Sequence, residues 1–358
     1  MYSPLPIRYD FSLRKLNTFG IAALAHAYVP VADVGMLAQV RADRALSNLP
    51  RLVLGGGSNI VLTQDYPGLV LHMVNGGIEL LGRTDQTIRV RAAAGVSWQA
   101  LVQWTLDHGY GGLENLSWIP GSVGASPIQN IGAYGVEAGS LIESVRYFDF
   151  LSGDMVTLGG TECAFGYRDS VFKNRLQDRA VILEVTFALP RQWQPNLQYA
   201  ELRQALEAEL ALADSEAAHK NLRRRSLADC NAAEISAAVI AIRMRKLPDP
   251  ALIGNAGSFF KNPLVSAATH ARLAAAWPGL VSFAQEDGRF KLAAGWLIDR
   301  AGWKGRFMGA AGVYEKQALV LVNRGAVTGA EIVQLAQAIQ ADIQARFGVA
   351  LEPEPLLI

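Results

Sequence analysis

The 358-residue sequence predicts a mixed helix-and-strand (α+β) protein of two to three domains. The length sets the number of domains, because a domain averages about 150 residues. Short strand-like runs dominate residues 1–190, and helical and strand-like patterns alternate after residue 230. Hydrophobic residues make up 51% of the chain and charged residues 18%, which is enough apolar surface to build sizeable cores.

The strand-like runs of the first half consist of β-rich or alternating apolar residues. They are Arg51–Leu54, Ile60–Leu62, Thr87–Arg91 and Val181–Phe187. A helix is predicted between them at Trp98–His108, where apolar residues recur at helical spacing. Gly55–Gly57 separates the first two runs, so the local pattern predicts a strand, a glycine turn and a second strand.

The composition changes between residues 191 and 230, where we place a domain boundary. Helical patterns occur at Glu201–Leu212, from Asn231 to the breaker at Pro248, and at Glu331–Phe347. Asn231 and Glu234 have the spacing of a capping box. We expect domains at residues 1–80, 81–227 and 228–349, with a C-terminal strand within 350–358 that packs back on the first.

Charge and composition exclude several classes of protein. Lys plus Arg number 33 and Asp plus Glu 32, so the net charge of +1 argues against a dedicated nucleic-acid binder. No apolar run approaches the ~20 residues of a membrane helix, and the start of the chain does not resemble a signal peptide. Two cysteines, Cys163 and Cys230, are too few for a disulfide framework, and we expect both to be small buried hydrophobes. We expect a soluble, cytoplasmic enzyme.

The first glycine segment is Gly55–Asn59, with the sequence GGGSN. Glycines let backbone N–H groups approach an anion closely, so the segment is a candidate phosphate cradle. It lacks the Gly-Lys-Ser/Thr of a Walker loop and the G-x-G-x-x-G of a dinucleotide-binding turn. A tight hairpin without a ligand is an equally good interpretation of this segment alone.

The second segment, Asn115–Val136, runs for 22 residues without a charged side chain and contains four glycines. Such a segment offers many backbone donors and no competing carboxylate, which suits a pyrophosphate bound by dipoles. A buried Ω-type loop is the alternative.

Seven motifs in a fixed order carry a resemblance to a known family. They are NTFG (Asn17–Gly20), GGGSN (Gly55–Asn59), IPGSVGASPIQNIGAYG (Ile119–Gly135), FGYRDSVFK (Phe165–Lys173), GNAGSFFKNP (Gly254–Pro263), KLAAGWLID (Lys291–Asp299) and LEPE (Leu351–Glu354). From about residue 14 to the C-terminus the chain closely resembles the UDP-N-acetylenolpyruvoylglucosamine reductases. These flavoenzymes complete UDP-N-acetylmuramic acid in peptidoglycan synthesis.

The resemblance implies a fold and a cofactor. Residues 1–80 and 81–227 would be the two subdomains of an FAD-binding fold of the vanillyl-alcohol-oxidase type, and 228–349 an α+β substrate-binding domain. The insertion Trp193–Tyr199 implies the subtype that closes a tyrosine loop over the substrate. The FAD contacts that it implies are Gly55, Gly56, Gly57, Ser58, Asn59, Ile119, Pro120, Gly121, Ser122, Gly124, Ala125, Gln129, Asn130, Gly132, Ala133, Tyr134 and Ile182.

The positions of the five histidines bear on two expectations, the linkage of the flavin and the presence of a metal. None lies in either glycine segment, where relatives with covalent flavin carry theirs, so we expect FAD to be bound non-covalently. Their spacing matches no metal site, and we expect no metal. NADPH is implied as the co-substrate.

The family reaction transfers a hydride from NADPH to FAD, and then to the methylene carbon of an enolpyruvyl ether. The site must bind a carboxylate, stabilise an enolate and supply a proton. The motifs imply that Arg168 binds the carboxylate, that Glu354 polarises the enolate with it, and that Ser258 donates the proton. By spacing alone, Arg168 would be a surface ion pair with Asp169, Glu354 a solvated carboxylate and Ser258 a turn serine.

The implied substrate contacts are Tyr199, Arg243, Lys246, Asn262, Phe283 and Gln317. Lys246 ends a helix, where a cation also complements the helix dipole without any ligand. Two positions depart from the family pattern: Phe283 stands where we expect a tyrosine, and Leu356 where some members have an arginine near the flavin. Arg223–Arg225 matches no motif, and we expect it to be a solvated face.

Two other functions stay open. The chain could be a flavin oxidase of the same fold that acts on another alcohol, or a sugar-nucleotide-binding protein without activity. The leading hypothesis is the reductase: a monomer whose partners are UDP-N-acetylglucosamine enolpyruvate and NADPH.

Overall fold

The computed structural model describes residues 4–218 and 225–358. They divide into two compact units. Unit 1 comprises the residues up to Tyr9, Ala27–Gly56 and Gly68–Arg245; unit 2 comprises Asp10–His26, Gly57–Pro67 and Lys246–Ile358. The predicted boundaries near 80 and 227 divide the chain differently, and they stay a prediction.

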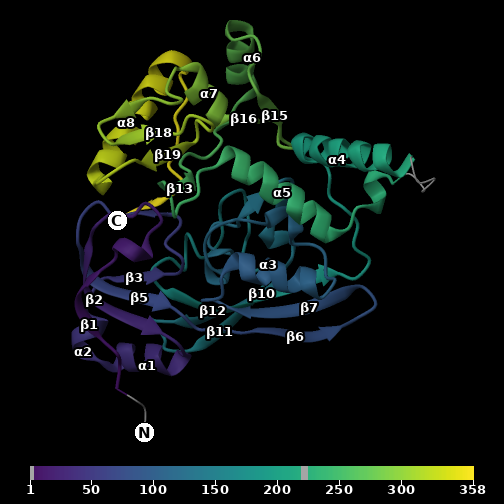
Figure 1. Ribbon diagram of the computed structural model, residues 1–358. Helices are drawn as coiled ribbons and strands as arrows, with labels where there is room; N and C mark the ends of the chain where they lie inside the picture. Colours follow the sequence, from purple (N-terminus) through teal and green to yellow (C-terminus); the bar gives the residue numbers. More distant parts are fainter. Residues whose placement is uncertain (1–3, 219–224) are drawn as a thin grey trace. The chain divides into compact units, whose positions relative to one another are not determined.

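Unit 1 is built on a five-stranded antiparallel sheet in the order β11-β10-β12-β7-β6. Its strands are β6 (Ile78–Arg83), β7 (Thr87–Ala93), β10 (Ile142–Asp149), β11 (Met155–Gly159) and β12 (Ala180–Pro190). Helix α3 (Trp98–Asp107) lies along one face of this sheet (Figure 1). It buries Trp98, Leu101 and Val102 against sheet residues such as Val90 and Phe187. The predicted helix Trp98–His108 is therefore present, and so are the predicted strands Thr87–Arg91 and Val181–Phe187.

A four-stranded sheet in the order β1-β2-β5-β3 precedes it in the chain. Its strands are β1 (Arg8–Ser12), β2 (Leu24–Val31), β3 (Arg51–Leu54) and β5 (Tyr66–Met73), with α1 (Val34–Ala42) and α2 (Arg44–Ser47) between β2 and β3. β3 pairs in parallel with β5. β4 (Ile60–Val61) pairs instead with β20 (Leu356–Leu357), so the hairpin interpretation of Gly55–Asn59 is wrong.

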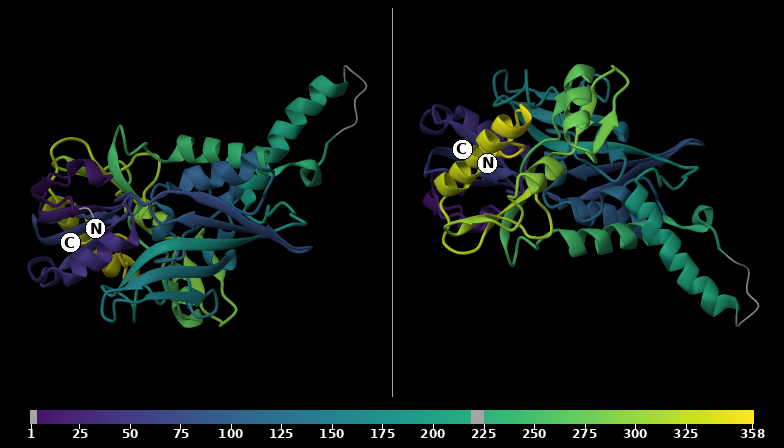
Figure 2. Two further views of the ribbon diagram at one scale, coloured as in Figure 1. Left: turned by 90° about the horizontal axis from the view of Figure 1, so that it is seen from below. Right: turned by 90° about the horizontal axis from the view of Figure 1, so that it is seen from above.

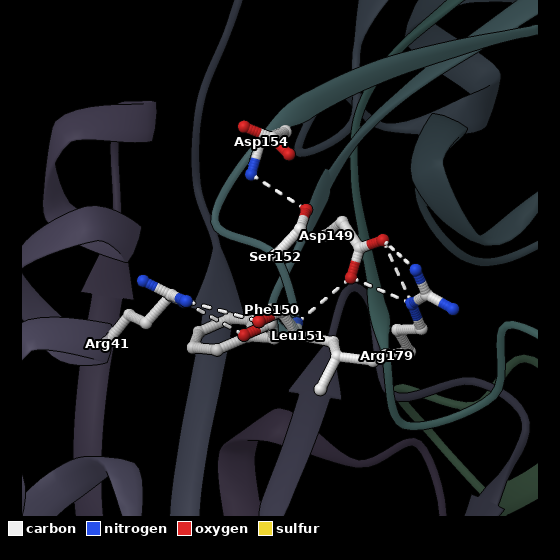
Figure 3. Close-up of polar contacts among 7 residues, drawn as sticks. All are labelled: Arg41, Asp149, Phe150, Leu151, Ser152, Asp154 and Arg179. Carbon is white, nitrogen blue, oxygen red and sulfur yellow. Dashed lines mark hydrogen bonds and ion pairs between the residues drawn. The ribbon is translucent and has the colours of Figure 1, made fainter.

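Side chains fix the turn between β10 and β11 in unit 1 (Figure 3). The buried Asp149 carboxylate accepts hydrogen bonds from Arg179 Nε at 2.8 and 2.9 Å and from Leu151 N at 2.9 Å. Arg41, on α1, donates to the carbonyl oxygens of Phe150 and Leu151 at 3.0 and 3.1 Å. These bonds tie α1 to a turn of the five-stranded sheet.

Unit 1 also contains β8 (Gly132–Ala133), β9 (Val136–Glu137), α4 (Ala200–Ala218) and all but the last residue of α5 (Ala232–Lys246). Helix α4 projects away from the five-stranded sheet in both views of Figure 2. The predicted capping box is confirmed: Asn231 N donates to Glu234 Oε2 at 2.8 Å, and Glu234 N to Asn231 Oδ1 at 3.0 Å. Arg225 pairs with the same carboxylate at 2.7 Å, whereas Arg223 and Arg224 lie outside the described residues.

Unit 2 has a four-stranded antiparallel sheet, β13-β19-β18-β17, and a three-stranded one, β14-β16-β15. The strands are β13 (Gly254–Ser258), β14 (Leu264–Val265), β15 (Ser282–Ala284), β16 (Phe290–Leu292), β17 (Phe307–Met308), β18 (Ala311–Val313) and β19 (Val320–Asn323). The helices are α6 (Ala267–Ala276), α7 (Ala294–Arg300) and α8 (Gly329–Phe347). Helix α8 confirms the predicted last helix and buries Ile332, Leu335, Ile339, Ile343 and Phe347. None of the helices in the described residues has the length and apolar character needed to cross a membrane.

Candidate active site

In unit 1, Gly55 and Gly56 of the first glycine segment pack against the second glycine segment. A side chain on Gly55 would come within 2.1 Å of Ser122 Oγ, and one on Gly56 within 2.9 Å of Gly121 Cα. Gly124 has the same constraint, because its Cβ would lie 2.6 Å from Ala94 Cβ at the end of β7. The absence of side chains is therefore what allows the three backbone stretches to approach.

Hydrogen bonds from neighbouring elements fix the second segment. Trp98 N donates to Gly121 O at 3.0 Å, Val123 N to Val96 O at 2.8 Å and Gly124 N to Ala94 O at 2.9 Å. The Trp98 indole also donates to Leu116 O at 2.8 Å. The segment is thus bound to the start of α3 and to the end of β7, and it is not a free loop.

The cradle fits a dinucleotide phosphate. Gly121 has φ 125°, and Trp118, Asn130 and Tyr134 have φ of 63°, 48° and 48°. Positive-φ residues of this kind let a backbone bend sharply, and such bends are one element of the backbone concavities that bind phosphates. The segment also contains a buried acceptor, Asn115 Oδ1, that accepts no hydrogen bond within the described residues and could accept one from a ligand hydroxyl.

Asn130 and Arg168 join this segment to the FGYRDSVFK turn. The buried Asn130 amide donates to Glu137 Oε2 at 2.8 Å and to Gly166 O at 3.0 Å. Arg168, with φ 55°, donates from Nη2 to Gly132 O at 2.9 Å and from Nη1 to Asn130 O at 3.5 Å. Asp169 accepts instead from Ser170 N and from Asn174 Nδ2, at 3.0 and 2.8 Å. The guanidinium is held against the glycine segment.

Three predicted residues meet at another part of unit 1. The rings of Tyr134 and Tyr199 are in edge-to-face contact, with centroids 5.0 Å apart. The Tyr134 hydroxyl and the half-buried Arg243 guanidinium share a hydrogen bond, and Arg243 Nε donates to Trp118 O at 3.1 Å. Burial raises the pKa of Tyr134 to about 12, so this hydroxyl stays protonated and can donate. Tyr134, which we expect at FAD, thus lies among residues expected at the substrate.

In unit 2 a strand irregularity exposes Ser258. The pairing of β13 with β19 shifts register between Asn255 and Ser258, and Gly257 has φ 68°. Asn255 Oδ1 accepts a hydrogen bond from Gly257 N at 2.9 Å and fixes this bulge. Ser258 is exposed, while the two residues after it, Phe259 and Phe260, are buried. A bulge commonly re-aims one side chain, and here it accompanies an exposed Ser258 next to the buried Phe259.

The LEPE segment lies directly beside Ser258. Glu354 N donates to Phe259 O at 2.8 Å, and Pro353 forms a β-bridge with Phe260. Asn59, the last residue of GGGSN, donates from Nδ2 to Glu354 O at 3.3 Å. The backbone of Glu354 therefore lies beside both Asn59 and the residue after Ser258, all within unit 2. Asn59 and Glu354 are 295 positions apart in the sequence.

Two of the predicted substrate residues of unit 2 meet at the start of α7. Asn262 Oδ1 accepts from Ala294 N at 2.9 Å, and Gln317 Oε1 lies 3.3 Å from where a side chain on Gly295 would be. The carbonyl of Leu319, two residues beyond Gln317, accepts a hydrogen bond from Phe259 N at 2.7 Å. Phe259 directly follows Ser258, so the backbone next to Gln317 lies beside the backbone next to Ser258. Phe283 instead lies on β15, paired with Lys291 and 52% exposed.

The two cysteines are buried, as predicted. Burial raises the pKa of Cys163 to about 11 and also raises the pKa of Cys230. Both thiols are therefore protonated at neutral pH, which is unfavourable for a nucleophile.

Comparison with known proteins gives the family. Residues 249–358 match the model of the UDP-N-acetylenolpyruvoylglucosamine reductase C-terminal domain, and residues 25–159 match an FAD binding domain. The UDP-N-acetylenolpyruvoylglucosamine reductase of Ralstonia nicotianae is 52% identical over 97% of this chain and 98% of its own. The chain belongs to this family.

Other relatives of the chain belong to the same family. The reductase of Azoarcus sp. strain BH72 is 51% identical over 99% of both chains. The crystal structure of the Thermus caldophilus reductase, 22% identical over 99% of both chains, has a TM-score of 0.66 and shares the fold. The predicted family, the FAD-binding fold and the class of FAD- and NADPH-dependent oxidoreductase of peptidoglycan synthesis are confirmed.

Two residues without a predicted role belong to the same region. Glu114 is only 2% exposed, and Asn115 is fully buried at the start of the second segment. The signal in the sequence is a single carboxylate directly before 22 uncharged residues, a position where a charge must have buried partners.

Proposed function

We propose that this chain reduces UDP-N-acetylglucosamine enolpyruvate to UDP-N-acetylmuramate with NADPH, in the cytoplasm and as a monomer. The observation that supports it most is the exposed Ser258 hydroxyl beside Glu354, in a chain of this family. A flavin-dependent reduction of a carbon–carbon double bond needs one proton donor and one group that tolerates developing negative charge, and these two residues supply both.

FAD, when bound, would supply the hydride chemistry: transfer from NADPH, and from the reduced flavin to the methylene carbon of the enolpyruvyl group. Gly55, Gly56, Gly121 and Ser122 would hold its pyrophosphate, because the three glycines bring uncharged backbone close to the Ser122 hydroxyl. Gly124 would contribute through the close packing of this segment on Ala94, since its N–H already donates to Ala94 O. The remaining residues of the two glycine segments, and Ile182 on β12, would surround FAD. Gly57, Ser58 and Asn59 continue the first segment.

Arg168 orients the substrate carboxylate. Its planar guanidinium stays charged and can bind two carboxylate oxygens at once. Its bonds to Gly132 O and Asn130 O leave the fork geometry fixed before substrate arrives. Arrival of the hydride leaves negative charge on the carbon next to that carboxylate, and Arg168 and Glu354 stabilise the resulting enolate.

Ser258 then gives its hydroxyl proton to the same carbon. A serine is a weak acid, but a carbanion-like enolate is a basic enough acceptor. The sugar nucleotide is bound by Tyr199, Arg243, Lys246, Asn262 and Gln317, and Phe283 contributes an apolar contact in place of a hydroxyl.

An anaerobic half-reaction experiment tests this function. The purified yellow protein is reduced with NADPH, excess NADPH is removed, and UDP-N-acetylglucosamine enolpyruvate is added while the flavin absorbance is followed. We expect rapid reoxidation with one UDP-N-acetylmuramate formed per flavin. A reduced flavin that reacts only with oxygen would indicate an oxidase instead, and a colourless preparation a binding protein.

A further inference from the structure

The loop Trp193–Tyr199, here called the tyrosine loop, is anchored on residues Gly111–Asn115 of the same unit. The Trp193 indole N–H donates to Glu114 Oε1 at 3.0 Å. Its ring covers Gly111 so closely that a side chain on Gly111 would come within 2.4 Å of the indole. The first residue of the loop is therefore fixed both by a hydrogen bond and by contact.

Both oxygens of the Glu114 carboxylate are hydrogen-bonded. Glu114 is 2% exposed, and its second oxygen accepts a hydrogen bond from Gly112 N at 2.5 Å. The backbone carbonyl of Glu114 accepts in turn from the Ser117 hydroxyl at 2.7 Å. A buried carboxylate with each oxygen occupied is costly to rearrange, so it forms a rigid anchor.

Asn115 anchors the middle of the loop. Its Nδ2 donates to Asn196 O and to Tyr134 O, both at 2.9 Å. The Asn196 side chain donates back to Gly135 O at 3.2 Å. One buried amide thus joins the tyrosine loop to the backbone of Tyr134, the residue whose ring contacts Tyr199.

Beyond the anchors, the loop leads into α4, whose Leu202 and Leu206 are buried against Ile235 and Val239 of α5. The loop is therefore held at both ends and in the middle, while the Tyr199 side chain remains 43% exposed. Fixing Trp193 and Asn196 in advance reduces the conformational entropy that is lost when the rest of the loop closes on a ligand.

We propose that Glu114 and Asn115 are positioning residues of the reductase: they hold the base of the tyrosine loop, through Trp193 and Asn196, so that Tyr199 reaches the sugar nucleotide when the loop closes over it. This inference rests on the proposed contact of Tyr199 with substrate. Because Asn115 also begins the segment that would hold FAD, the substrate loop and the cofactor segment share one anchor.

Trp193→Phe tests the anchor with little disturbance, since it keeps an aromatic ring over Gly111 and removes only the N–H. We expect KM for UDP-N-acetylglucosamine enolpyruvate to rise about tenfold, the effect of losing one hydrogen bond to a charged group. We expect kcat to change less than about twofold, because the interaction is present equally in the ground and transition states. Gly111→Ala, which displaces the indole from its other side, should raise KM in the same way.

The matched control is Trp303→Phe in unit 2. The Trp303 indole donates to Asp342 Oδ2 at 2.8 Å, so this variant loses the same type of bond away from the loop. We expect its KM to equal that of the wild type. An equal rise in both variants would show a general loss of stability and overturn the positioning role.

A double-mutant cycle with Tyr199→Phe separates positioning from other effects. If Trp193 acts through Tyr199, Trp193→Phe adds little to KM in the Tyr199→Phe background; the same tenfold factor in both backgrounds would overturn the inference. Hydrogen exchange of the loop amides in the substrate-free holoenzyme should become several-fold faster in Trp193→Phe, and unchanged exchange would also overturn it. An unchanged KM in Tyr199→Phe alone would instead refute the proposed substrate contact, and the positioning role with it.

Discussion

The glycine segment Asn115–Val136 of unit 1 and the strand β13 of unit 2 use glycine for opposite purposes. Gly124 is required for space, because a side chain there would overlap Ala94. Gly257 has nothing within 4 Å of where its side chain would be, but its φ of 68° shapes the bulge that exposes Ser258. In the first region the absence of a side chain lets backbone segments pack closely, and in the second the backbone conformation presents a side chain.

The same contrast holds for carboxylates. Asp149 in unit 1 is buried and bound by Arg179, whereas Glu354 in unit 2 lies beside an exposed serine. Changes in the segment Asn115–Val136 or at Asp149 should therefore act on packing, cofactor affinity and stability. Changes at the Ser258 region should act on the rate of one chemical step.

The largest expected effect is that of Ser258→Ala on the second half-reaction. Losing a positioned proton donor typically slows a step about 10²–10⁴-fold. We expect stopped-flow reoxidation of the reduced flavin by the enolpyruvyl substrate to slow by that factor, while reduction by NADPH keeps nearly the wild-type rate, since no proton from Ser258 enters that step. Ser258→Cys should recover part of the loss.

The alanine variant also tests the comparison of the two regions. Its FAD affinity and melting temperature should match the wild type, because Ser258 is exposed. Reoxidation at the wild-type rate would remove Ser258 from the mechanism.

Local patterns predicted the helices of this fold well. Helix α8 has five apolar residues on one face, and α5 begins with a reciprocal Asn231–Glu234 cap. These signals are contained in a few neighbouring residues, so they can be recognised without the rest of the chain. Helix α4, predicted at Glu201–Leu212, extends to Ala218 because no stop signal ends it.

Long-range pairings could not be predicted in the same way. The run at Ile60 follows a glycine turn and suggests a hairpin, yet β4 pairs with β20 from the end of the chain. The expectation that a strand within 350–358 packs back on residues 1–80 names no partner strand, because the local sequence does not specify a pairing with residues nearly 300 positions away. The anchor of the tyrosine loop is another case, since Glu114 and Trp193 become neighbours only through the folded sheet.

The next prediction concerns Gly124→Ala, which fills space in the cofactor segment. The added methyl group must displace Ala94 or the segment, and overpacking of this kind costs about 1–3 kcal/mol. We expect a lower free energy of unfolding and weaker FAD binding, measured by urea titration and by flavin fluorescence. The control is Gly82→Ala on β6, where nothing lies within 4 Å. Equal FAD affinity in the two variants would show that Gly124 is not required for space.

The smallest expected effect is that of Asp149→Asn. This variant tests whether the Asp149 carboxylate contributes to stability alone or also to catalysis. We expect the variant to lose about 1–2 kcal/mol at neutral pH, near the lower end for hydrogen bonds to a charged group, because Arg179 is about 40% exposed. Flavin reoxidation should keep the wild-type rate. The control is Asp154→Asn, a change of an exposed carboxylate in the same turn (Figure 3).

The pH dependence of the unfolding free energy shows whether the charge of Asp149 stabilises the fold. The hydrogen bonds from Arg179 hold the pKa of Asp149 below its ordinary value in the folded protein. The stabilisation is therefore complete above the unfolded pKa of about 3.9 and is lost as the pH falls through the lower folded pKa. Urea unfolding of the holoprotein should show a wild-type advantage over Asp149→Asn that is constant from about pH 5 to 7 and shrinks below about pH 4. An advantage that persisted unchanged in acid would mean that the shape of the side chain, and not its charge, holds the turn; an altered reoxidation rate would mean that unit 1 also contributes a carboxylate to the chemistry.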